Sequence, residues 1–113
     1  MTVTGTGWGG RNQELALSAA FRIAGTNSIL ASAGTDGVDG HSKAAGAIVD
    51  GTTIERSRKL GLDARTYLKN NDSNTFFKRL GDEIITGPTG TNVNDIIVGL
   101  SLTPRRNRRA SSA

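Results

Sequence analysis

The sequence predicts a single α/β domain in which helices pack on a mixed β-sheet. A chain of 113 residues has room for one modest hydrophobic core. Apolar residues recur at helical spacing between positions 12 and 24, whereas short apolar runs at residues 29–33, 83–86 and 96–100 are typical of strands. Helices and strands interspersed along one chain favour an α/β arrangement.

Composition indicates an ordered domain whose core residues are small. Hydrophobic residues make up 35% of the sequence and aromatic residues only 4%, so we expect Ala, Ile, Leu and Val to fill the core. The chain has no cysteine, which excludes disulfides and thiolate metal ligands. No apolar run approaches the roughly 20 residues of a membrane span, and residues 1–6 lack the pattern of a signal peptide. We therefore expect a cytoplasmic protein with no membrane partner.

The net charge of +4 comes from the C-terminal end of the chain. Four of the 14 basic residues lie in the last nine positions, so residues 1–104 hold ten basic and ten acidic side chains. A short basic tail can add sequence-independent affinity for nucleic-acid backbones, but it is more often a solvated end. We therefore divide the chain into a domain at residues 1–103 and a basic, flexible tail at 104–113, and expect no nucleic-acid partner.

The clearest helix is predicted at residues 12–24, where two adjacent apolar stripes indicate packing on a sheet. Gly25 ends this helix. Its N-terminus follows two glycines and carries Arg11, so free N–H groups and a guanidinium would suit a carboxylate or a phosphate. The alternative is that Arg11 points into solvent. Trp8, in the Gly-rich segment before this helix, is expected to cover the core.

Further short helices are predicted from local composition and capping signals. Residues 44–50 are Ala-rich and are predicted to form a helix. Residues 52–55 have the spacing of a capping box, which predicts another helix that starts at Thr52 and stops at Gly61. Two more helices, at 64–69 and 74–80, are predicted to start at the N-caps Asp63 and Ser73.

The segment 34–40 places Asp36 and Asp39 among three glycines, directly after the predicted strand 29–33. Glycines allow positive φ and a close approach of the backbone to a ligand. Ligands of open α/β sheets bind beyond the carboxyl ends of the strands, where this loop lies. Two surface Asp-Gly turns are the alternative interpretation.

A second polar loop, residues 87–95, joins the last two predicted strands and is longer than a hairpin requires. Its Thr and Asn side chains suit backbone capping or hydrogen bonds to a small polar ligand. Gly-rich loops can present successive N–H groups to an anion. The loop lacks the lysine of a P-loop, so it is not a Walker motif.

Three segments in this order, residues 9–17, 34–40 and 87–95, resemble the C-terminal domain of the glycerate 2-kinase family, known as the MOFRL domain and in older usage as hydroxypyruvate reductase. The resemblance covers residues 2–102 and includes residues 44–47 and 70–73. It implies ATP-dependent phosphorylation of D-glycerate at the 2-hydroxyl, in a cleft between two domains. In the family, the nucleotide site and a lysine important for transfer belong to a larger N-terminal domain that this sequence does not include. That domain, joined in cis or supplied in trans, is the expected partner, and homo-oligomers are compatible with the resemblance.

On this reading Arg11 pairs with the glycerate carboxylate or a phosphate oxygen, and Asp36 or Asp39 orients the attacking hydroxyl or holds Mg²⁺. The expected catalytic residues are therefore Arg11, Asp36 and Asp39, the last two also as metal ligands. Hydrogen bonds to substrate are expected from a further set of residues: Gly10, Asn12, Thr35, Thr89, Thr91, Asn92 and Asn94. The family more often has Pro, Thr and an acidic or neutral residue where this chain has residues 41–43, which leaves the metal role of the loop open.

Two other functions compete with the kinase reading. The first is a stand-alone module that binds a small ligand or takes part in assembly without catalysis. The second is a hydroxypyruvate reductase, as the older family name suggests, but residues 5–10 match a dinucleotide fingerprint only loosely and Trp8 would crowd its turn. We expect the isolated chain to lack kinase activity, because it offers no Gly-rich loop that ends in lysine.

Overall fold

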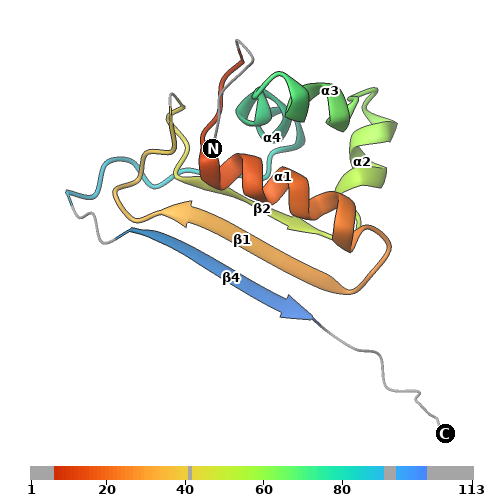
Figure 1. The fold of residues 1–113 in the computed structure, drawn as a ribbon, viewed down its shortest axis with the longest axis horizontal. Helices are drawn as coiled ribbons and strands as arrows, with labels where there is room; N and C mark the ends of the chain where they lie inside the picture. The colour runs from red at the N-terminus through yellow and green to blue at the C-terminus, as the bar shows by residue number, and fades with distance from the viewer. Residues whose placement is uncertain (1–6, 41, 91–93, 102–113) are drawn as a thin grey trace, which may run out of the picture.

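The computed structural model describes residues 7–40, 42–90 and 94–101, which form a sheet covered on one side by helices. The elements follow in the order α1 (Arg11–Ile23), β1 (Ser28–Gly34), β2 (Gly46–Asp50), α2 (Thr53–Lys59), α3 (Ala64–Lys69), α4 (Ser73–Leu80), β3 (Glu83–Ile84) and β4 (Asp95–Ser101). Figure 1 shows all four helices on the same side of the sheet. The prediction of helices packed on a sheet in one domain is confirmed. The expected strand at residues 2–4 lies outside the described residues.

The sheet has the strand order β3-β2-β1-β4, and each described pairing is antiparallel. A mixed sheet was expected, but here each strand runs opposite to its neighbour. Ala31 faces Ile48 on one side and Val98 on the other. Because directly paired residues share a face, the register puts Ile29, Ile48, Ile96, Val98 and Leu100 together on the face without helices, where each is 37–59% exposed. We call these five residues the open sheet face.

Residues 44–50 contain strand β2, so the helix predicted there is wrong. A Cβ at Gly46 would lie 1.8 Å from the Ser32 carbonyl oxygen, which shows how closely β2 approaches β1. Val49 points into the core with 1% exposure, whereas Ile48 points to the open sheet face with 42% exposure. The alternation of a strand is present, but small alanines hide it in the sequence.

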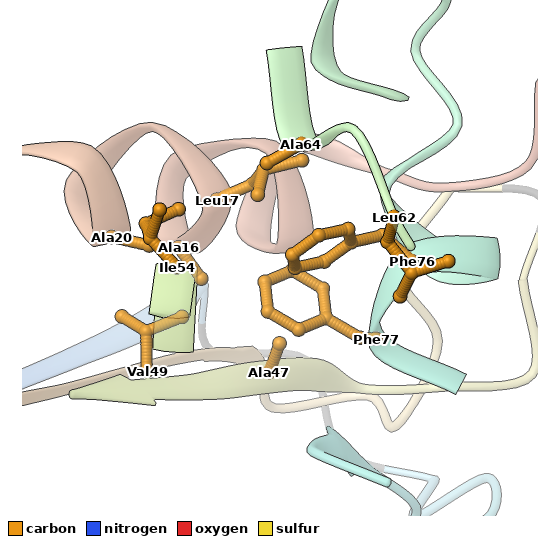
Figure 2. Close-up of a cluster of buried hydrophobic side chains, with 10 residues drawn as sticks. All are labelled: Ala16, Leu17, Ala20, Ala47, Val49, Ile54, Leu62, Ala64, Phe76 and Phe77. Atoms are coloured by element: carbon orange, nitrogen blue, oxygen red, sulfur yellow. The ribbon is translucent and has the colours of Figure 1, made fainter. Parts of the chain in front are cut away.

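The core lies between α1, α4 and β2 (Figure 2). Ala16, Leu17 and Ala20 of α1 are fully buried, in agreement with the predicted apolar stripes. Phe76 and Phe77, both with no exposure, are the largest side chains of this core and meet edge to face with ring centroids 5.2 Å apart. Aliphatic residues alone therefore do not fill it, because two of the few aromatic residues supply its bulk.

Several predicted helix ends match the structure. Asp63 caps α3 through the Arg65 amide, and Gly81 ends α4 in the left-handed conformation. Ser73, by contrast, is the first residue of α4 and Asp72 is its N-cap, although no side-chain bond to the backbone caps this helix. Thr52 likewise makes no capping-box bond; its N–H and hydroxyl both donate to Asp50.

Candidate functional site

The loop after β1 folds back on itself and then packs against the N-terminus of α1. The Gly37 N–H donates to the Gly34 carbonyl at 3.1 Å, and Gly37 has φ of +84°. Asp36 accepts a hydrogen bond from the Val38 N–H at 3.0 Å, and its side chain is partly exposed. Asp36 thus occupies a local Asx turn, and three residues later the chain brings Asp39 to the helix.

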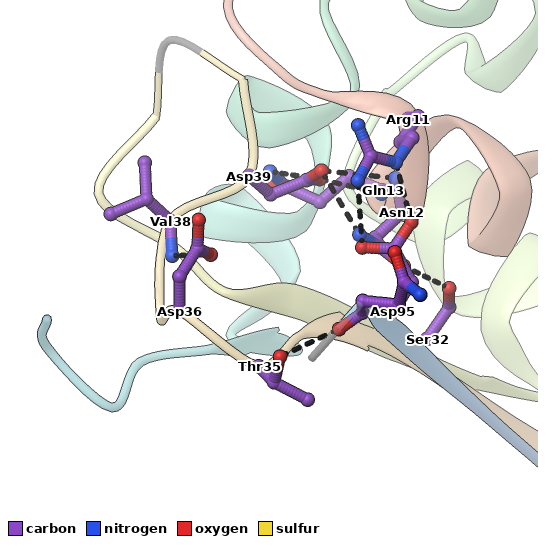
Figure 3. Close-up of polar contacts among 10 residues, drawn as sticks. Arg11, Asn12, Gln13, Ser32, Thr35, Asp36, Val38, Asp39 and Asp95 are labelled. Carbon is purple, nitrogen blue, oxygen red and sulfur yellow. Dashed lines mark hydrogen bonds and ion pairs between the residues drawn. The ribbon is translucent and has the colours of Figure 1, made fainter. Parts of the chain in front are cut away.

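Asp39 is buried, with 2% exposure, against the N-terminus of α1 (Figure 3). Its Oδ1 accepts from the Asn12 N–H at 3.0 Å and from the Asn12 amide at 3.3 Å. Its Oδ2 accepts from the Gln13 N–H at 2.8 Å and from the Gln13 amide at 3.0 Å. A carboxylate at a helix N-terminus is stabilised both by these donors and by the helix dipole. Asp39 therefore acts as the N-cap side chain of α1, although it lies 26 and 27 residues from its partners.

Three of the N–H groups predicted to be free at this helix end have partners within the protein. Asn12 and Gln13 donate to Asp39, and the Glu14 N–H donates to the Gly10 carbonyl. Gly10 is needed here, because a Cβ on it would lie 2.4 Å from Asp39 Oδ1. Hydrogen bonds within the protein therefore occupy both Asp39 oxygens.

A buried polar network extends from Asp39 in two directions. Asn12 accepts from the Ser32 hydroxyl at 2.6 Å, which ties α1 to the centre of β1. Gln13 donates to the Ser42 hydroxyl at 2.8 Å and accepts from the Asn74 amide at 2.8 Å. The amide side chains at the start of α1 therefore connect the loop, the sheet and α4. Asn12, expected to bind substrate, is one of these structural links.

Arg11 pairs with Asp95, the first residue of β4. Its Nε and Nη2 donate to the two carboxylate oxygens, the second at 3.0 Å. The hydrogen bond from Arg11 lowers the pKa of Asp95, and the same bond raises the pKa of Arg11. The Arg11 side chain is 68% exposed and that of Asp95 25%. The predicted interpretation that Arg11 points only into solvent is incomplete, because the guanidinium is oriented by a carboxylate.

Asp36 and Asp95 face the same small space. A Cβ on Gly34 would lie 3.2 Å from Asp36 Oδ1 and 3.5 Å from Asp95 Oδ1. The negative charges of Asp39 and of Asp36 also contribute to the raised pKa of Arg11. We call Arg11, Asp36 and Asp95 the Arg11 cluster. Sequence reasoning did not select Asp95, although its position between a polar loop and an apolar strand was the available signal.

The loop 87–95 closes against the loop 34–40. The Thr35 hydroxyl donates to the Asn94 carbonyl at 2.7 Å, and the Thr89 hydroxyl donates to the Thr35 carbonyl at 2.6 Å. A Cβ on Gly37 would lie 2.0 Å from the Gly87 carbonyl oxygen, so the two loops meet backbone to backbone. These hydroxyl–carbonyl bonds hold the loops together. Thr91 and Asn92 lie outside the described residues.

All three predicted motifs therefore meet at one end of the sheet, with an exposed arginine and two carboxylates at their centre. The two metal ligands predicted from sequence differ in their exposure to solvent: Asp39 is buried, whereas Asp36 is partly exposed near Asp95. Within residues 7–40, 42–90 and 94–101, no group of three or more His, Asp or Glu side chains is arranged to hold a metal ion. No helix among these residues is long and apolar enough to cross a membrane.

Comparison with known proteins gives consistent matches. The MOFRL family model matches residues 1–95. The D-glycerate 2-kinase of Thermotoga maritima is 60% identical over 99 residues, which cover 87% of this chain and 24% of that protein. The glycerate 2-kinase of Pyrococcus horikoshii is 44% identical over 109 residues, covering 96% of this chain and 24% of that protein.

A relative with another name and a solved structure also match this chain. A protein of Agrobacterium vitis with the provisional name hydroxypyruvate reductase is 52% identical over 91 residues, covering 80% of this chain and 21% of that protein. The crystal structure of the Thermotoga maritima glycerate kinase superposes with a TM-score of 0.87 at 57% identity, covering 90% of this chain and 25% of that one. This chain thus spans about a quarter of the length of the relatives that it matches.

Proposed function

Because this chain belongs to the MOFRL family, we propose that it forms the substrate side of a glycerate 2-kinase, which transfers a phosphoryl group from ATP to the 2-hydroxyl of D-glycerate. The observation that carries this proposal is the Arg11 cluster, an exposed guanidinium held by Asp95 beside a second carboxylate, Asp36. Relatives named glycerate 2-kinase support the substrate assignment.

In this proposal Arg11 binds the glycerate carboxylate or a phosphate oxygen. A guanidinium recognises either group through two parallel N–H donors, and Arg11 already makes this type of contact with Asp95. Because the side chain is 68% exposed, a substrate anion can reach it. Asp95 orients the guanidinium before the substrate binds, and Gly10 allows the backbone to pass close to Asp39.

Asp36 is the group that orients the attacking hydroxyl. Its backbone carbonyl accepts from the Thr89 N–H at 3.2 Å, so the second loop fixes its position. The Asp36 carboxylate also fits Mg²⁺, which prefers one or two carboxylates together with water, whereas both Asp95 oxygens accept from Arg11. When bound, Mg²⁺ neutralises charge on the phosphates of ATP. Asp39 does not fit this role, because four N–H donors already occupy its oxygens.

The remaining polar residues would contact the substrate through backbone groups and oxygen lone pairs rather than through their hydroxyl protons. The hydroxyls of Thr35 and Thr89 donate to carbonyls between the loops. Their role is to fix the position of Asn94 and the neighbouring backbone beside the Arg11 cluster. Thr91 and Asn92 remain proposed substrate contacts from the sequence.

We further propose that this chain does not phosphorylate glycerate alone. Transfer of the phosphoryl group requires cations at its oxygens and a binding site for the nucleotide. The relatives are about four times as long as the matched segment, so a nucleotide-binding part in cis or in trans would complete the site. A catalytic cleft would then form where that part meets the Arg11 cluster.

A coupled assay of glycerate-dependent ADP release tests this proposal. We expect no turnover by the chain alone, and turnover when it is joined to, or mixed with, the N-terminal part of a relative. Arg11→Ala should abolish most of that turnover, whereas Arg22→Ala, a matched change of an exposed arginine at the other end of α1, should not. Robust turnover by the chain alone would refute the half-site proposal.

Two further arms of the experiment address the competing functions. Oxidation of NADH or NADPH with hydroxypyruvate, by the complete assembly, would instead support a reductase. Calorimetric binding of D-glycerate without turnover in any assembly would support a non-catalytic binding module.

A further inference from the structure

A cleft of about 600 Å³ lies between α4, β3 and the segment that precedes β2. None of the residues of the Arg11 cluster lines it. Its volume lies within the roughly 300–1,000 Å³ of small-molecule sites. The cleft is therefore distinct from the Arg11 cluster and large enough for a metabolite, and Ser42 and Asn74 of the buried polar network lie in its wall.

Three cations border this cleft: Lys43 before β2, and Lys78 and Arg79 in the last turn of α4. Cations are stabilised at the C-terminal end of a helix, which is sufficient to explain Lys78 and Arg79. It does not explain Lys43, which comes from a different segment and adds its charge to the same space.

The cleft cations have no ion-pair partner among the carboxylates of the described residues. The ion pairs in that part of the chain involve Arg11, Arg56 and Lys59 instead. Glu83, the acidic residue that lines the cleft, accepts a hydrogen bond from the Asn74 amide at 2.8 Å. The lining therefore carries an excess of positive charge, which favours an anion with more than one negative charge.

An apolar wall completes the cleft. Trp8 and Ile85 both line it, and they are 59% and 58% exposed. Trp8 was expected to cover the core, and that expectation is wrong. Its backbone is fixed at the start of α4, because its N–H donates to Asp72 at 2.9 Å and its carbonyl accepts from the Asn74 N–H at 2.8 Å.

A large aromatic side chain on a fixed backbone beside cations is suited to a ligand that has both an apolar part and a charged part. We propose that this cleft binds an organic phosphate of the nucleotide type, with the phosphates at Lys43, Lys78 and Arg79 and the planar ring system at Trp8 and Ile85. This site does not depend on the proposed kinase function, since no residue of the Arg11 cluster takes part.

Trp8 provides the assay, because it is the single tryptophan of the sequence and lines the cleft. The full chain is titrated with ADP, pyrophosphate and adenosine while Trp8 fluorescence is recorded, and calorimetry measures the same affinities independently. We expect saturable binding of ADP, at least about tenfold tighter than binding of either fragment, because only ADP engages both parts of the cleft.

Lys43→Glu and Lys78→Glu should each weaken ADP binding about tenfold or more, because each reverses a charge beside the phosphates. Arg22→Glu makes the same change in net charge on α1, away from the cleft lining, and should alter the affinity less than about twofold. Circular dichroism checks that each variant is folded; Lys43→Gln and Lys78→Gln replace any reversal variant that is not.

Three outcomes would overturn the proposal. The first is the absence of saturable ADP binding by both fluorescence and calorimetry. The second is adenosine or pyrophosphate binding as tightly as ADP. The third is Arg22→Glu weakening ADP binding as much as the cleft variants do, which would show that only net charge attracts the nucleotide.

Discussion

Asp39→Asn tests whether a buried carboxylate holds the N-terminus of α1 on the loop 34–40. The substitution keeps the size of the side chain but turns one oxygen into an NH₂ group. That group must face the donors of either Asn12 or Gln13, since each Asp39 oxygen accepts from the backbone N–H and the side-chain amide of one of them. Donors then meet donors in a site that is 2% exposed.

The expected loss of stability follows from these contacts. Hydrogen bonds to a charged group contribute about 1.5–3 kcal/mol each, and two of the four are lost. Removing the negative charge from the helix N-terminus adds roughly 0.3–1 kcal/mol. Because such contributions overlap, we expect the free energy of unfolding to fall by about 3–5 kcal/mol. This is a large share of the roughly 5–15 kcal/mol that stabilises a domain.

Urea unfolding followed by circular dichroism measures this loss. With an m-value of roughly 1–3 kcal/mol/M, the midpoint should fall by about 1–3 M or more while the slope stays constant. Asp36→Asn is the matched control, because Asp36 is partly exposed and an Asn oxygen can still accept its bond from Val38. The control should lose less than about 0.5 kcal/mol. Equal stability of Asp39→Asn and the wild-type chain would refute the capping role.

Three further predictions concern the loops, the ion pair and the tail. Gly37→Ala should destabilise the domain by about 2 kcal/mol or more, because its Cβ would meet the Gly87 carbonyl. Gly25→Ala, at a glycine with a similar φ and open space around it, should lose only about 1 kcal/mol. Similar losses for the two variants in urea unfolding would contradict this difference. NMR titration should give the Asp95 carboxyl a pKa below its ordinary value of about 3.9, and Arg11→Ala should move that pKa back towards the ordinary value. A pKa that is lowered in the folded state stabilises the fold at pH values above the unfolded pKa. The small contribution of this exposed pair to stability should therefore vanish as the pH falls through the lowered pKa. Ending the chain at residue 102 should change the melting temperature by less than about 2 °C, and a large drop in calorimetry would show that the tail packs on the domain.

Local signals in the sequence were sufficient for most elements. The apolar stripes of α1, the cap at Asp63 and the left-handed Gly81 all depend on residues within one or two turns, which a sequence displays directly. β2 was missed because alanines on both faces conceal the alternation of buried Val49 and exposed Ile48. Here the tertiary environment, a close approach to β1 at Gly46, decided the conformation.

The candidate site was predictable as a set of loops but not as a set of contacts. Arg11 and Asp95 are 84 positions apart, and nothing in the local sequence indicates that they pair. The local sequence also gives no sign of the role of Asp39, because residues 39–40 have the composition of a surface Asp-Gly turn. Only the fold brings its carboxylate to the N-terminus of α1. Residue types thus indicated which loops contain the polar side chains of the candidate site. Which carboxylates are buried in structural hydrogen bonds and which are exposed could be known only from the fold.

The cap formed by Asp39 also has a consequence for hydrogen exchange. In most helices the amide protons of the first turn exchange rapidly with deuterated solvent, because they have no partner in the helix. Here the amides of Asn12 and Gln13 are bonded to a buried carboxylate from another segment, so their exchange requires the loop and the helix to separate. We therefore expect the start of α1 and the loop 34–40 to move as one unit, so that a ligand that shifts the loop would also shift the helix carrying Arg11.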